Sequence, residues 1–496
     1  MNGLKLHLEK TLELLFKISY LVLALCTFNT FIYKSSVQPV FVKLTLACGM
    51  VLILTRLVKF RKYIKTPCIV LMILFCISFA ISTIMNREYG MVENGKWIIW
   101  TGLQFFALYV CDMERDMKSY NKEFEILSHI IIGYSAVAAI ISLKMLIVSY
   151  SEFFETAEGE FLISGFTWGR LWGVYTDPNY GAVFTVISIL LSIVFFLRKG
   201  ILLKIIYVIC IILNYLYLVF SDSRTGEISL VGGLAVFLFF SLNQVWKSKK
   251  GFVKYALIIG VIILVTGGSL LGIRIVKVEY NKVLAPTFAK MFVEKEEAKK
   301  LKKQDQTKKP GQTTKPEEKK KQEELKKQEE AKKQEEMKRK LGRKQDLEED
   351  VSNGRFELWK SAVEVWRTSP VYGVGYVTFV PYAKEHTPDT YAVNNDVGEY
   401  TSMHNAFINT LAYQGGLGFI LLLLLAGYMI WYIIGPVFRE TGGVYLYLDI
   451  MLASVAAVVL SMVFLLEGFY TLSPGSFVLW SFSGYMVKYA YGIRKG

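Results

Sequence analysis

Hydrophobic residues occur in long blocks along the chain, separated by short polar segments. Blocks of about 18 or more apolar residues are typical of transmembrane helices, because about 20 residues cross the hydrocarbon core of a bilayer. The pattern therefore predicts an all-α polytopic membrane protein and not a large soluble helical protein. The twelve expected spans lie near residues 12–33, 37–58, 67–85, 96–111, 124–149, 178–198, 201–220, 225–245, 253–273, 404–434, 445–466 and 475–492.

Composition and charge agree with this pattern and give it an orientation. Of the 496 residues, 53% are hydrophobic, and the net charge is +15. If the N-terminus is cytoplasmic, the inner segments hold 20 Lys and Arg residues and the short outer loops hold five. Such a bias predicts that both termini are cytoplasmic. The positive charge is then explained by topology, and it gives no reason to expect a nucleic-acid partner.

The longest interval between spans, 274–403, is expected outside the cytoplasm. It divides the chain into a membrane domain at 1–273, an extracytoplasmic loop at 274–403 and a second membrane domain at 404–496. Within the loop, residues 294–350 form a charged low-complexity arm with a six-residue repeat, as in KKQEELKKQEEAKKQEEM. Its apolar residues recur every six positions and build no continuous stripe. We interpret the arm as a spacer or mobile helix; contact with an anionic wall or glycan polymer is the alternative.

The rest of the loop is predicted to begin with an interfacial helix at 352–369. Ser352 or Asn353 is the expected N-cap, and the helix should end near Ser369-Pro370. The segment that follows, to residue 403, is expected to be an irregular loop over the mouth of the membrane domain. One apolar face is expected to lie flat at the outer interface, and it comprises Phe356, Trp359, Val363 and Trp366.

Polar residues gather where several apolar blocks meet the outer surface. Polar groups at the edge of a membrane are costly and often functional. The predicted topology places four such segments on the same side, although they are far apart in sequence, and we expect them to form one site. They are GRLWGVYTDPNYGA (169–182), SDSRTGE (221–227), GRFELW (354–359) and TSMHN (401–405).

The residue types in these segments indicate a particular chemistry. Guanidinium groups bind phosphate through two parallel hydrogen bonds, and a lipid diphosphate places its phosphates at this depth. Histidine is the side chain best suited to accept a proton near neutral pH. Arginines beside one histidine thus suggest attack by a hydroxyl on a sugar carbon, with a lipid diphosphate as the leaving group. The outer segments contain no paired carboxylates at metal-binding spacing, so neither a metal nor another cofactor is expected.

Each candidate residue also has a simpler interpretation. Arg170 and Arg224 could extend from the interface towards water. Arg355 could pair with Glu357 or with an acidic residue at 346–350, and His404 could only cap a helix. Asp177-Pro178-Asn179 could be an ordinary helix start, with Asp177 as the N-cap.

Combined, these motifs resemble the bacterial O-antigen ligase family. His404-Asn405 is followed, after nine residues, by Gly415-Gly416-Leu417-Gly418, which is similar to the family's His-Asn and Gly-x-x-Gly pattern. GRFELWKSAVEVWRTSPVYGVG (354–375), SRTG at 223–226 and DPN at 177–179 resemble further family signatures. The resemblance covers roughly residues 165–430, and the arm at 294–350 departs from the common pattern without touching a motif.

The resemblance implies a role for each candidate residue. His404 would be the base or would orient the acceptor, Arg224 and Arg355 would hold the donor diphosphate, and Arg170 is a further candidate for the same role. Asn405, Asp177 and Asn179 would support them. The implied enzyme is a metal-independent glycosyltransferase of the bacterial cell membrane with an extracytoplasmic site. Its donor would be an undecaprenyl-diphosphate-linked glycan and its acceptor a glycan or lipid, with a flippase and a chain-length regulator as candidate partners.

Several functions remain open at this stage. The His-Asn motif favours a ligase, whereas the excess of Lys over Arg, 43 to 14, is typical of an AT-rich genome and gives some weight to a polymerase of capsule or wall polysaccharide. A transporter or flippase of lipid-linked glycan would instead show charges near the bilayer midplane and broken helices. A third alternative is a scaffold that recruits partners through the charged arm.

Overall fold

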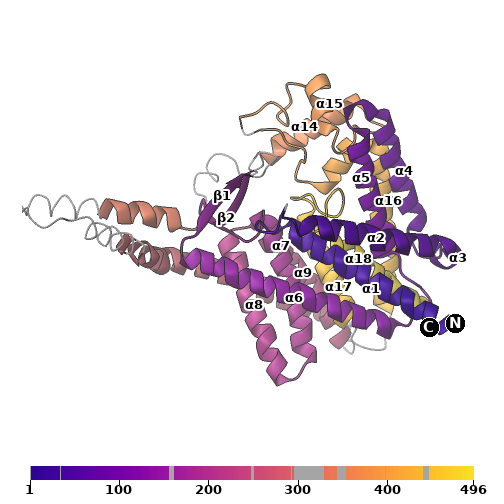
Figure 1. Cartoon of the computed structure of the whole chain (residues 1–496). Helices are drawn as coiled ribbons and strands as arrows, with labels where there is room; N and C mark the ends of the chain where they lie inside the picture. Colours follow the sequence, from indigo (N-terminus) through magenta and orange to yellow (C-terminus); the bar gives the residue numbers. More distant parts are fainter. Residues whose placement is uncertain are drawn as a thin grey trace, which may run out of the picture.

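The computed structural model describes residues 2–33, 35–155, 161–246, 251–291, 293–294, 329–342, 354–396, 398–439 and 446–495. Over these residues the chain is mainly helical, with a small sheet at one side (Figure 1). The helices are α1 (Asn2–Thr27), α2 (Gln38–Val58), α3 (Phe60–Tyr63), α4 (Ile69–Met85), η1 (Arg87–Tyr89), α5 (Met91–Leu103), η2 (Gln104–Tyr109), α6 (Met117–Ile147), α7 (Pro178–Arg198), α8 (Ile201–Ser221), α9 (Arg224–Val245), α10 (Phe252–Glu279), η3 (Tyr280–Leu284), α14 (Arg355–Thr368), α15 (Phe379–His386), α16 (Ala406–Arg439), α17 (Leu446–Ser461) and α18 (Pro474–Lys495). The strands are β1 (Ser151–Glu155), β2 (Phe161–Thr167) and β3 (Arg170–Gly173).

The helices follow the apolar blocks of the sequence. Each of the twelve expected spans overlaps a described helix, which agrees with a polytopic all-α membrane protein. Within the described residues, seven helices have the length and apolar character needed to cross a bilayer, and α4 and α17 are shorter apolar helices. The number of membrane crossings therefore stays a prediction. The seven are Gln38–Val58, Met117–Ile147, Pro178–Arg198, Ile201–Ser221, Arg224–Val245, Phe252–Met291 and Ala406–Pro436.

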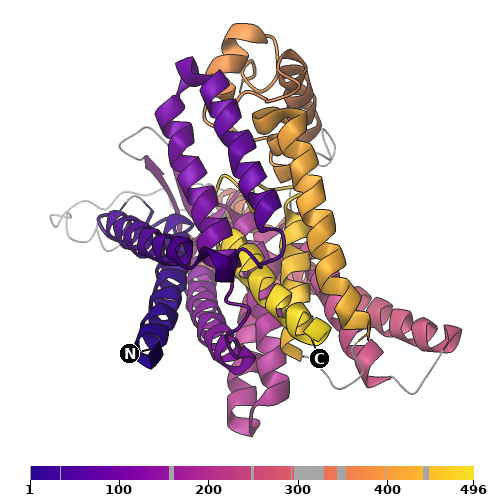
Figure 2. The same cartoon turned by 90° about the vertical axis from the view of Figure 1, so that its right-hand side faces the viewer.

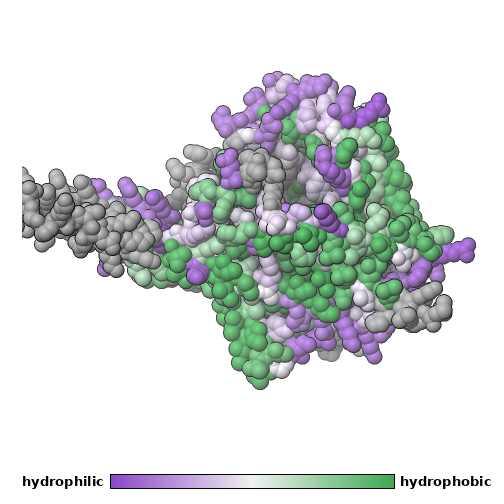
Figure 3. Space-filling view, in the orientation of Figure 1, coloured by the Kyte–Doolittle hydropathy of each residue, from purple (hydrophilic) through white to green (hydrophobic). Residues whose placement is uncertain are grey.

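The surface of the molecule has the polarity expected for a protein in a bilayer. Hydrophobic residues cover the middle of the helix bundle, and hydrophilic residues lie above it, over α14 and α15, and below it (Figure 3). α4, α5 and α16 stand side by side and carry α14 and α15 at their ends (Figure 2). The two chain termini lie at the same end of the bundle, away from α14 and α15 (Figure 1).

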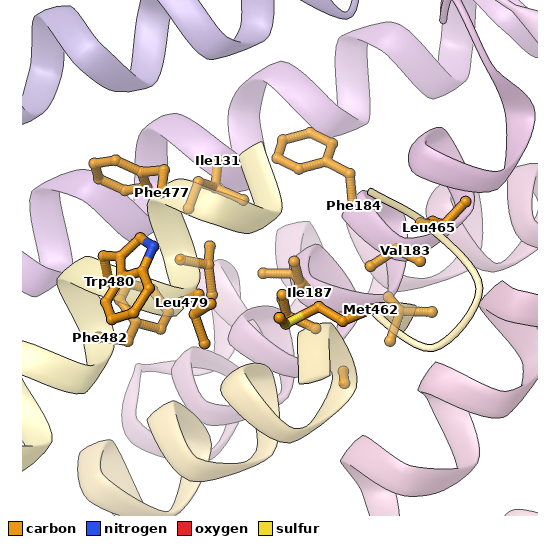
Figure 4. Close-up of a cluster of buried hydrophobic side chains, with 14 of the residues drawn as sticks. Ile131, Val183, Phe184, Ile187, Met462, Leu465, Phe477, Leu479, Trp480 and Phe482 are labelled. Carbon is orange, nitrogen blue, oxygen red and sulfur yellow. The ribbon is translucent and has the colours of Figure 1, made fainter. Parts of the chain in front are cut away.

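Helix α7 lies at the centre of the bundle. Of an 18-residue stretch of this helix, 78% is buried, in agreement with a sequence that is apolar on every side. Its side chains meet the segment after α17 and the start of α18 in one cluster (Figure 4). Because α7 is fixed along its length by this packing, the residues at its beginning have a fixed place at the end of the core. The cluster includes Ile131, Val183, Phe184, Ile187, Met462, Leu465, Phe477, Leu479, Trp480 and Phe482.

A buried group of charges joins α1, α2 and α6 at the other end of the bundle. The Lys17 ammonium contacts Glu13 at 2.8 Å and Glu123 at 2.5 Å, and Arg115 contacts Glu123 at 2.8 Å. Arg56 of α2 adds a contact to Glu13 at 3.3 Å. These side chains are at most 5% exposed, so each charge depends on its partners in place of water. The sequence patterns did not single out this group.

Helix α16 is broken at Gly415, the first residue of the Gly415-Gly416 pair that follows the His-Asn motif. Gly415 has φ 66° and ψ −168°, which are not helical values. The break lies against residues 370–375, and the Gly416 N–H donates to the Pro370 carbonyl at 2.8 Å. A Cβ on Gly415 would collide with the backbone of Val371, so this close approach requires glycine. The loop thus satisfies backbone groups that a break in a membrane helix would otherwise leave without partners.

A helix is present at the predicted position, but its start differs from expectation, and its place at the membrane interface stays a prediction. α14 begins at Arg355, and its N-cap position is held by Gly354 in place of Ser352 or Asn353, which lie outside the described residues. The aromatic stripe predicted for the interface is largely outside the protein core: Phe356 is 63% exposed and contacts Trp359 edge-on. A second face of the helix packs on the rest of the protein, through Leu358, Ser361, Ala362 and Val365. The expected irregular loop to residue 403 also contains a short helix, α15.

A three-stranded antiparallel sheet stands between α6 and α7, where only a loop was expected from sequence. β1 pairs with β2 and β2 pairs with β3, with a bulge at Gly165/Phe166. The β2–β3 hairpin turns through Trp168 and Gly169, with φ values of 52° and 68°. Positive φ at both central residues is the signature of a tight two-residue hairpin. The turn brings Arg170, the first residue of β3, back beside Thr167.

Part of the charged arm lies against this sheet. We name residues 329–342 the arm end; they form a helix at 329–339, and the residues after it, 340–342, lie beside Gly169. Residues 295–328 and 343–353 lie outside the described residues. Although the arm has no continuous apolar stripe, two side chains of this segment are buried, because Arg339 is 3% and Leu341 is 7% exposed. Asn281 fixes this end by accepting a hydrogen bond from the Leu341 N–H at 2.7 Å and donating one to its carbonyl at 2.9 Å.

Candidate functional site

The start of α7 organises one half of the site. The Asp177 carboxylate accepts a hydrogen bond from the Asn179 N–H at 2.6 Å, and Asp177 has extended backbone angles. It is therefore the N-cap of α7, in agreement with the simpler interpretation, with Pro178 in the first turn. The Asn179 side chain oxygen accepts hydrogen bonds from Arg170 at 2.8 Å and from the Ser223 hydroxyl at 2.9 Å. The start of β3, the start of α7 and the cap of α9 thus meet at this amide.

Arg170 is buried inside this half of the site. Only 7% of the residue is exposed, and its Nε donates to the Ser221 carbonyl at 2.9 Å. An arginine that extended from the interface towards water would be exposed, so that interpretation is wrong for Arg170. Its hydrogen bonds to Ser221 and Asn179 fasten β3 to the end of α8 and the start of α7. A direct role in holding a diphosphate stays a prediction for this residue.

Arg224 stands on the outer surface of the same half. Ser223 caps α9 by accepting the Gly226 N–H at 3.1 Å, and Arg224 is the exposed first residue of that helix. The residue before this cap, Asp222, adopts a left-handed conformation with φ 49°. Its carboxylate and that of Glu227 both contact the Lys277 ammonium, at 2.8 Å and 2.9 Å. The turn is therefore held by charges on both sides.

His404 and Asn405 have separate structural tasks at the start of α16. The Asn405 side chain oxygen accepts hydrogen bonds from the backbone N–H groups of Phe407 and Ile408, each at 3.0 Å. Asn405 is therefore the cap of α16, and His404 does not have that function. His404 has a left-handed backbone with φ 50°, an uncommon conformation for a residue other than glycine. Strain of this kind often marks a functional site.

The electrostatic surroundings of His404 join the two halves. Burial lowers the pKa of this imidazole below its usual range, the Asp177 carboxylate raises the pKa, and the Arg355 guanidinium lowers it. The charges at the start of α7 and at the start of α14 therefore both act on the imidazole in the loop before α16. The net direction is downward, so His404 is largely neutral at pH 7 and able to accept a proton.

Arg355 is placed by the loop segments around it. Its guanidinium carbon lies 5.7 Å from the centre of the Phe464 ring, in the segment between α17 and α18. One turn later on the same helix, the Trp359 indole N–H donates to the Met403 carbonyl at 3.0 Å. The residue before His404 is thus fastened to α14, and α14 carries Arg355 towards the imidazole.

The segment after α17 completes the site, and the sequence-based prediction did not include it. The Ala406 N–H donates to the Met462 carbonyl at 2.8 Å, and Tyr180 hydrogen-bonds the backbone of Leu466. Glu467 is 2% exposed and accepts a hydrogen bond from the Ser461 hydroxyl at 2.7 Å; burial raises its pKa to about 7. The sequence feature that could have pointed to Glu467 is its position as a single acidic residue between two apolar blocks.

The candidate residues thus form two connected sets. Arg170, Asn179 and Ser223 share hydrogen bonds, while His404 interacts with Asp177 and Arg355. The hydrogen bond from the Asn179 N–H to the Asp177 carboxylate, at 2.6 Å, links the two sets at the start of α7. Within the described residues, no group of three or more His, Cys, Asp or Glu side chains is arranged to hold a metal ion.

Comparison with known proteins agrees with these motifs. Residues 206–423 match the model of the O-antigen ligase family, and this segment contains Arg224, Arg355 and His404. Arg170 and the Asp177-Pro178-Asn179 start of α7 precede the matched residues. No curated protein matches the chain. This part of the chain is thus similar to the O-antigen ligase family, which supports an assignment to the O-antigen ligase and polymerase proteins of surface polysaccharide assembly.

Proposed function

We propose that this protein transfers a glycan from an undecaprenyl-diphosphate-linked donor to an acceptor hydroxyl at the extracytoplasmic face of the bacterial cell membrane. The observation that carries the proposal is the place of His404, which has a left-handed backbone and an imidazole within the electrostatic reach of the Asp177 carboxylate and the Arg355 guanidinium. The transfer extends a polysaccharide if the acceptor is another repeat unit, and attaches one if the acceptor is a wall polymer or lipid.

The roles follow from the charges of the side chains. His404 accepts the proton as the acceptor oxygen forms its bond to the anomeric carbon of the donor. The bond from that carbon to the phosphate oxygen breaks, and the diphosphate leaves with the electron pair. Arg355 and Arg224 stabilise the departing charge in the place that a metal ion takes in other glycosyltransferases. Asp177 stabilises the protonated imidazole.

A groove beside the site offers a place for the donor lipid. Apart from Ser483 its lining residues are apolar; the groove runs between α16, α17 and α18 and has a volume of about 170 Å³. Phe407 and Met462 line it, and both lie within a few residues of the His404 loop or its Ala406 contact. A groove of this size holds only the part of a polyprenyl chain nearest the diphosphate, and leaves the rest in the bilayer.

The experiment that tests the proposal uses purified protein in lipid nanodiscs with a lipid-linked repeat unit from the host. We expect release of undecaprenyl diphosphate together with glycan on the acceptor, and the same rate with EDTA present. Ladder analysis of surface polysaccharide from a deletion strain separates the two forms of the reaction: single repeat units accumulate if polymerisation is lost, and free lipid-linked chains if attachment is lost. Absence of transfer by correctly folded protein, with donor and acceptor both present, would contradict the proposal.

A flippase for lipid-linked glycan is the second candidate, because α16 is broken and the bundle contains buried charges. In a transporter, the free backbone groups at a helix break bind the transported ligand. Here residues 370–375 already form hydrogen bonds with the backbone groups at the break, which argues against transport. A vesicle assay that follows movement of the lipid-linked donor between leaflets tests this candidate. Movement without glycan transfer would favour it over the enzyme.

The pH dependence of transfer gives a specific prediction for the charges around His404. The rate should fall on the acid side through a pKa below 6.5, because burial favours the neutral imidazole. Asp177→Asn keeps a helix cap but removes the carboxylate that raises this pKa. The acid limb should therefore move to lower pH in the variant. An acid limb that stays in place or moves to higher pH would contradict this arrangement of charges.

A further inference from the structure

A second, larger cavity lies beside the sheet, outside the site described above. Its volume is about 1270 Å³, which is more than the roughly 300–1,000 Å³ typical of a small-ligand pocket. Strands β1 and β2 and the hairpin turn form one wall, the end of α10 with η3 forms the second, and the arm end forms the third.

The hairpin presents an exposed aromatic surface to this cavity. Trp168 is 65% exposed, although it occupies a turn position with φ 52°. Its ring lies 5.9 Å from that of Phe153 and 6.2 Å from that of Trp172, centre to centre. The neighbouring rings therefore support the indole while one side of it faces outwards. A flat, exposed indole with such support is suited to the apolar C–H face of a sugar ring.

The other walls are basic. Lys282, Lys338, Arg339 and Lys340 line the cavity together with a single acidic residue, Glu335. Arg339 pairs with Glu335 at 3.1 Å, and Lys340 pairs with Glu336 at 2.8 Å. Lys282 and Lys338 form no ion pair within the part of the chain that the structure describes. Among the residues that the structure describes, these two lysine charges have no neutralising carboxylate, and they favour an anionic ligand.

The cavity walls are joined by backbone contacts close to the candidate site. The Gly342 N–H donates to the Gly169 carbonyl at 3.3 Å, and Asn281 makes two hydrogen bonds to the backbone of Leu341. Trp168 is two residues before Arg170, whose guanidinium reaches Asn179 at the start of α7. A chain that occupies the cavity would therefore follow the hairpin towards the site of transfer.

We propose that this cavity is a binding subsite for an anionic saccharide chain, the acceptor or growing product of the transfer. Trp168 stacks on a sugar ring, and Lys282 and Lys338 pair with carboxylate or phosphate groups on the chain. The identity of the ligand as acceptor or product rests on the proposed function. Saccharide binding itself does not depend on catalysis, so the two can be tested apart.

The test measures binding of three oligosaccharides to the full-length protein in nanodiscs. The probes are an oligogalacturonate, a phosphomannan oligosaccharide and neutral maltoheptaose, which distinguish carboxylate, phosphate and neutral ligands. We expect at least one anionic probe to bind at least tenfold more tightly than maltoheptaose, with an affinity that falls as salt increases. Trp168→Ala should weaken that binding about tenfold or more, and Trp168→Phe should restore most of it.

Charge variants and controls complete the experiment. Lys282→Gln combined with Lys338→Gln should remove the preference for the anionic probe. Lys384→Gln, which neutralises an exposed lysine on α15 that pairs with Glu399, should bind as the wild type does. Wild-type affinity in the Trp168 and double lysine variants, or equal binding of all three probes, would overturn the proposal. His404→Ala should retain binding; if it also retains transfer, the proposed function fails while the subsite stands.

Discussion

Replacement of His404 by alanine is expected to lower the rate of glycan transfer by about 10²–10⁴-fold, the usual contribution of a general base. The protein should remain folded, because Asn405 and not His404 caps α16. The measurement is transfer from a lipid-linked donor in nanodiscs, together with the thermal unfolding temperature of each variant.

Two matched variants separate chemistry from backbone strain at this position. His404→Asn removes the base but keeps a residue that tolerates the left-handed conformation, so it should lose transfer without loss of stability. His386→Ala changes another histidine of the extracytoplasmic loop, at the end of α15, and should leave the rate unchanged. Transfer at the wild-type rate by a folded His404→Asn protein would remove His404 from the mechanism.

Replacement of Arg355 by lysine should reduce transfer by roughly 10–100-fold, although the charge is retained. A charge-assisted hydrogen bond contributes about 1.5–3 kcal/mol, and an ammonium cannot reproduce the paired bonds of a guanidinium to a phosphate. The loss should appear as weaker use of the donor, measured as kcat/KM with donor concentration varied.

Arg367→Lys is the matched control for this substitution. It makes the same change at the other end of α14, where the residue is exposed and is not one of the candidate site residues. Its kcat/KM should equal that of the wild type. If Arg355→Lys and Arg355→Ala both behaved like Arg367→Lys, the guanidinium would have no part in donor recognition.

The helices could be predicted from sequence because a long apolar block has few stable arrangements. Inside a bilayer its backbone polar groups must bond within the segment, so it forms a helix wherever it crosses. The twelve blocks were found on that basis, and each overlaps a helix. Whether a short apolar helix such as α4 or α17 crosses the whole bilayer depends on its packing against other helices, which the hydrophobic pattern does not encode.

The short elements outside the bundle could not be predicted in the same way. The hairpin turns on Trp168-Gly169, which is a weaker turn signal than Asn-Gly, so the sequence favoured a loop over β2 and β3. In α14 two apolar stripes compete, and the aromatic one is the more hydrophobic. Packing against α16 buries the other stripe, which contains Leu358, Ala362 and Val365.

The candidate site was predictable as a meeting of segments but not in its details. Topology alone brought the His404 and Arg355 segments to the same side of the membrane. The sequence could not show which of His404 and Asn405 caps α16, because both residue types occur at helix starts. It also could not place Glu467, since only the packing of the segment after α17 against α16 and α18 brings that residue into the core near Tyr180.

The strongest test of the proposed site is a cryo-electron microscopy structure of the protein in nanodiscs with undecaprenyl diphosphate, the proposed leaving group. We expect density for the diphosphate between the Arg224 and Arg355 guanidinium groups, beside the His404 imidazole, with the lipid chain entering the groove between α16 and α17. Diphosphate density at the opposite end of the bundle, or bound out of reach of both arginines, would contradict the proposed site.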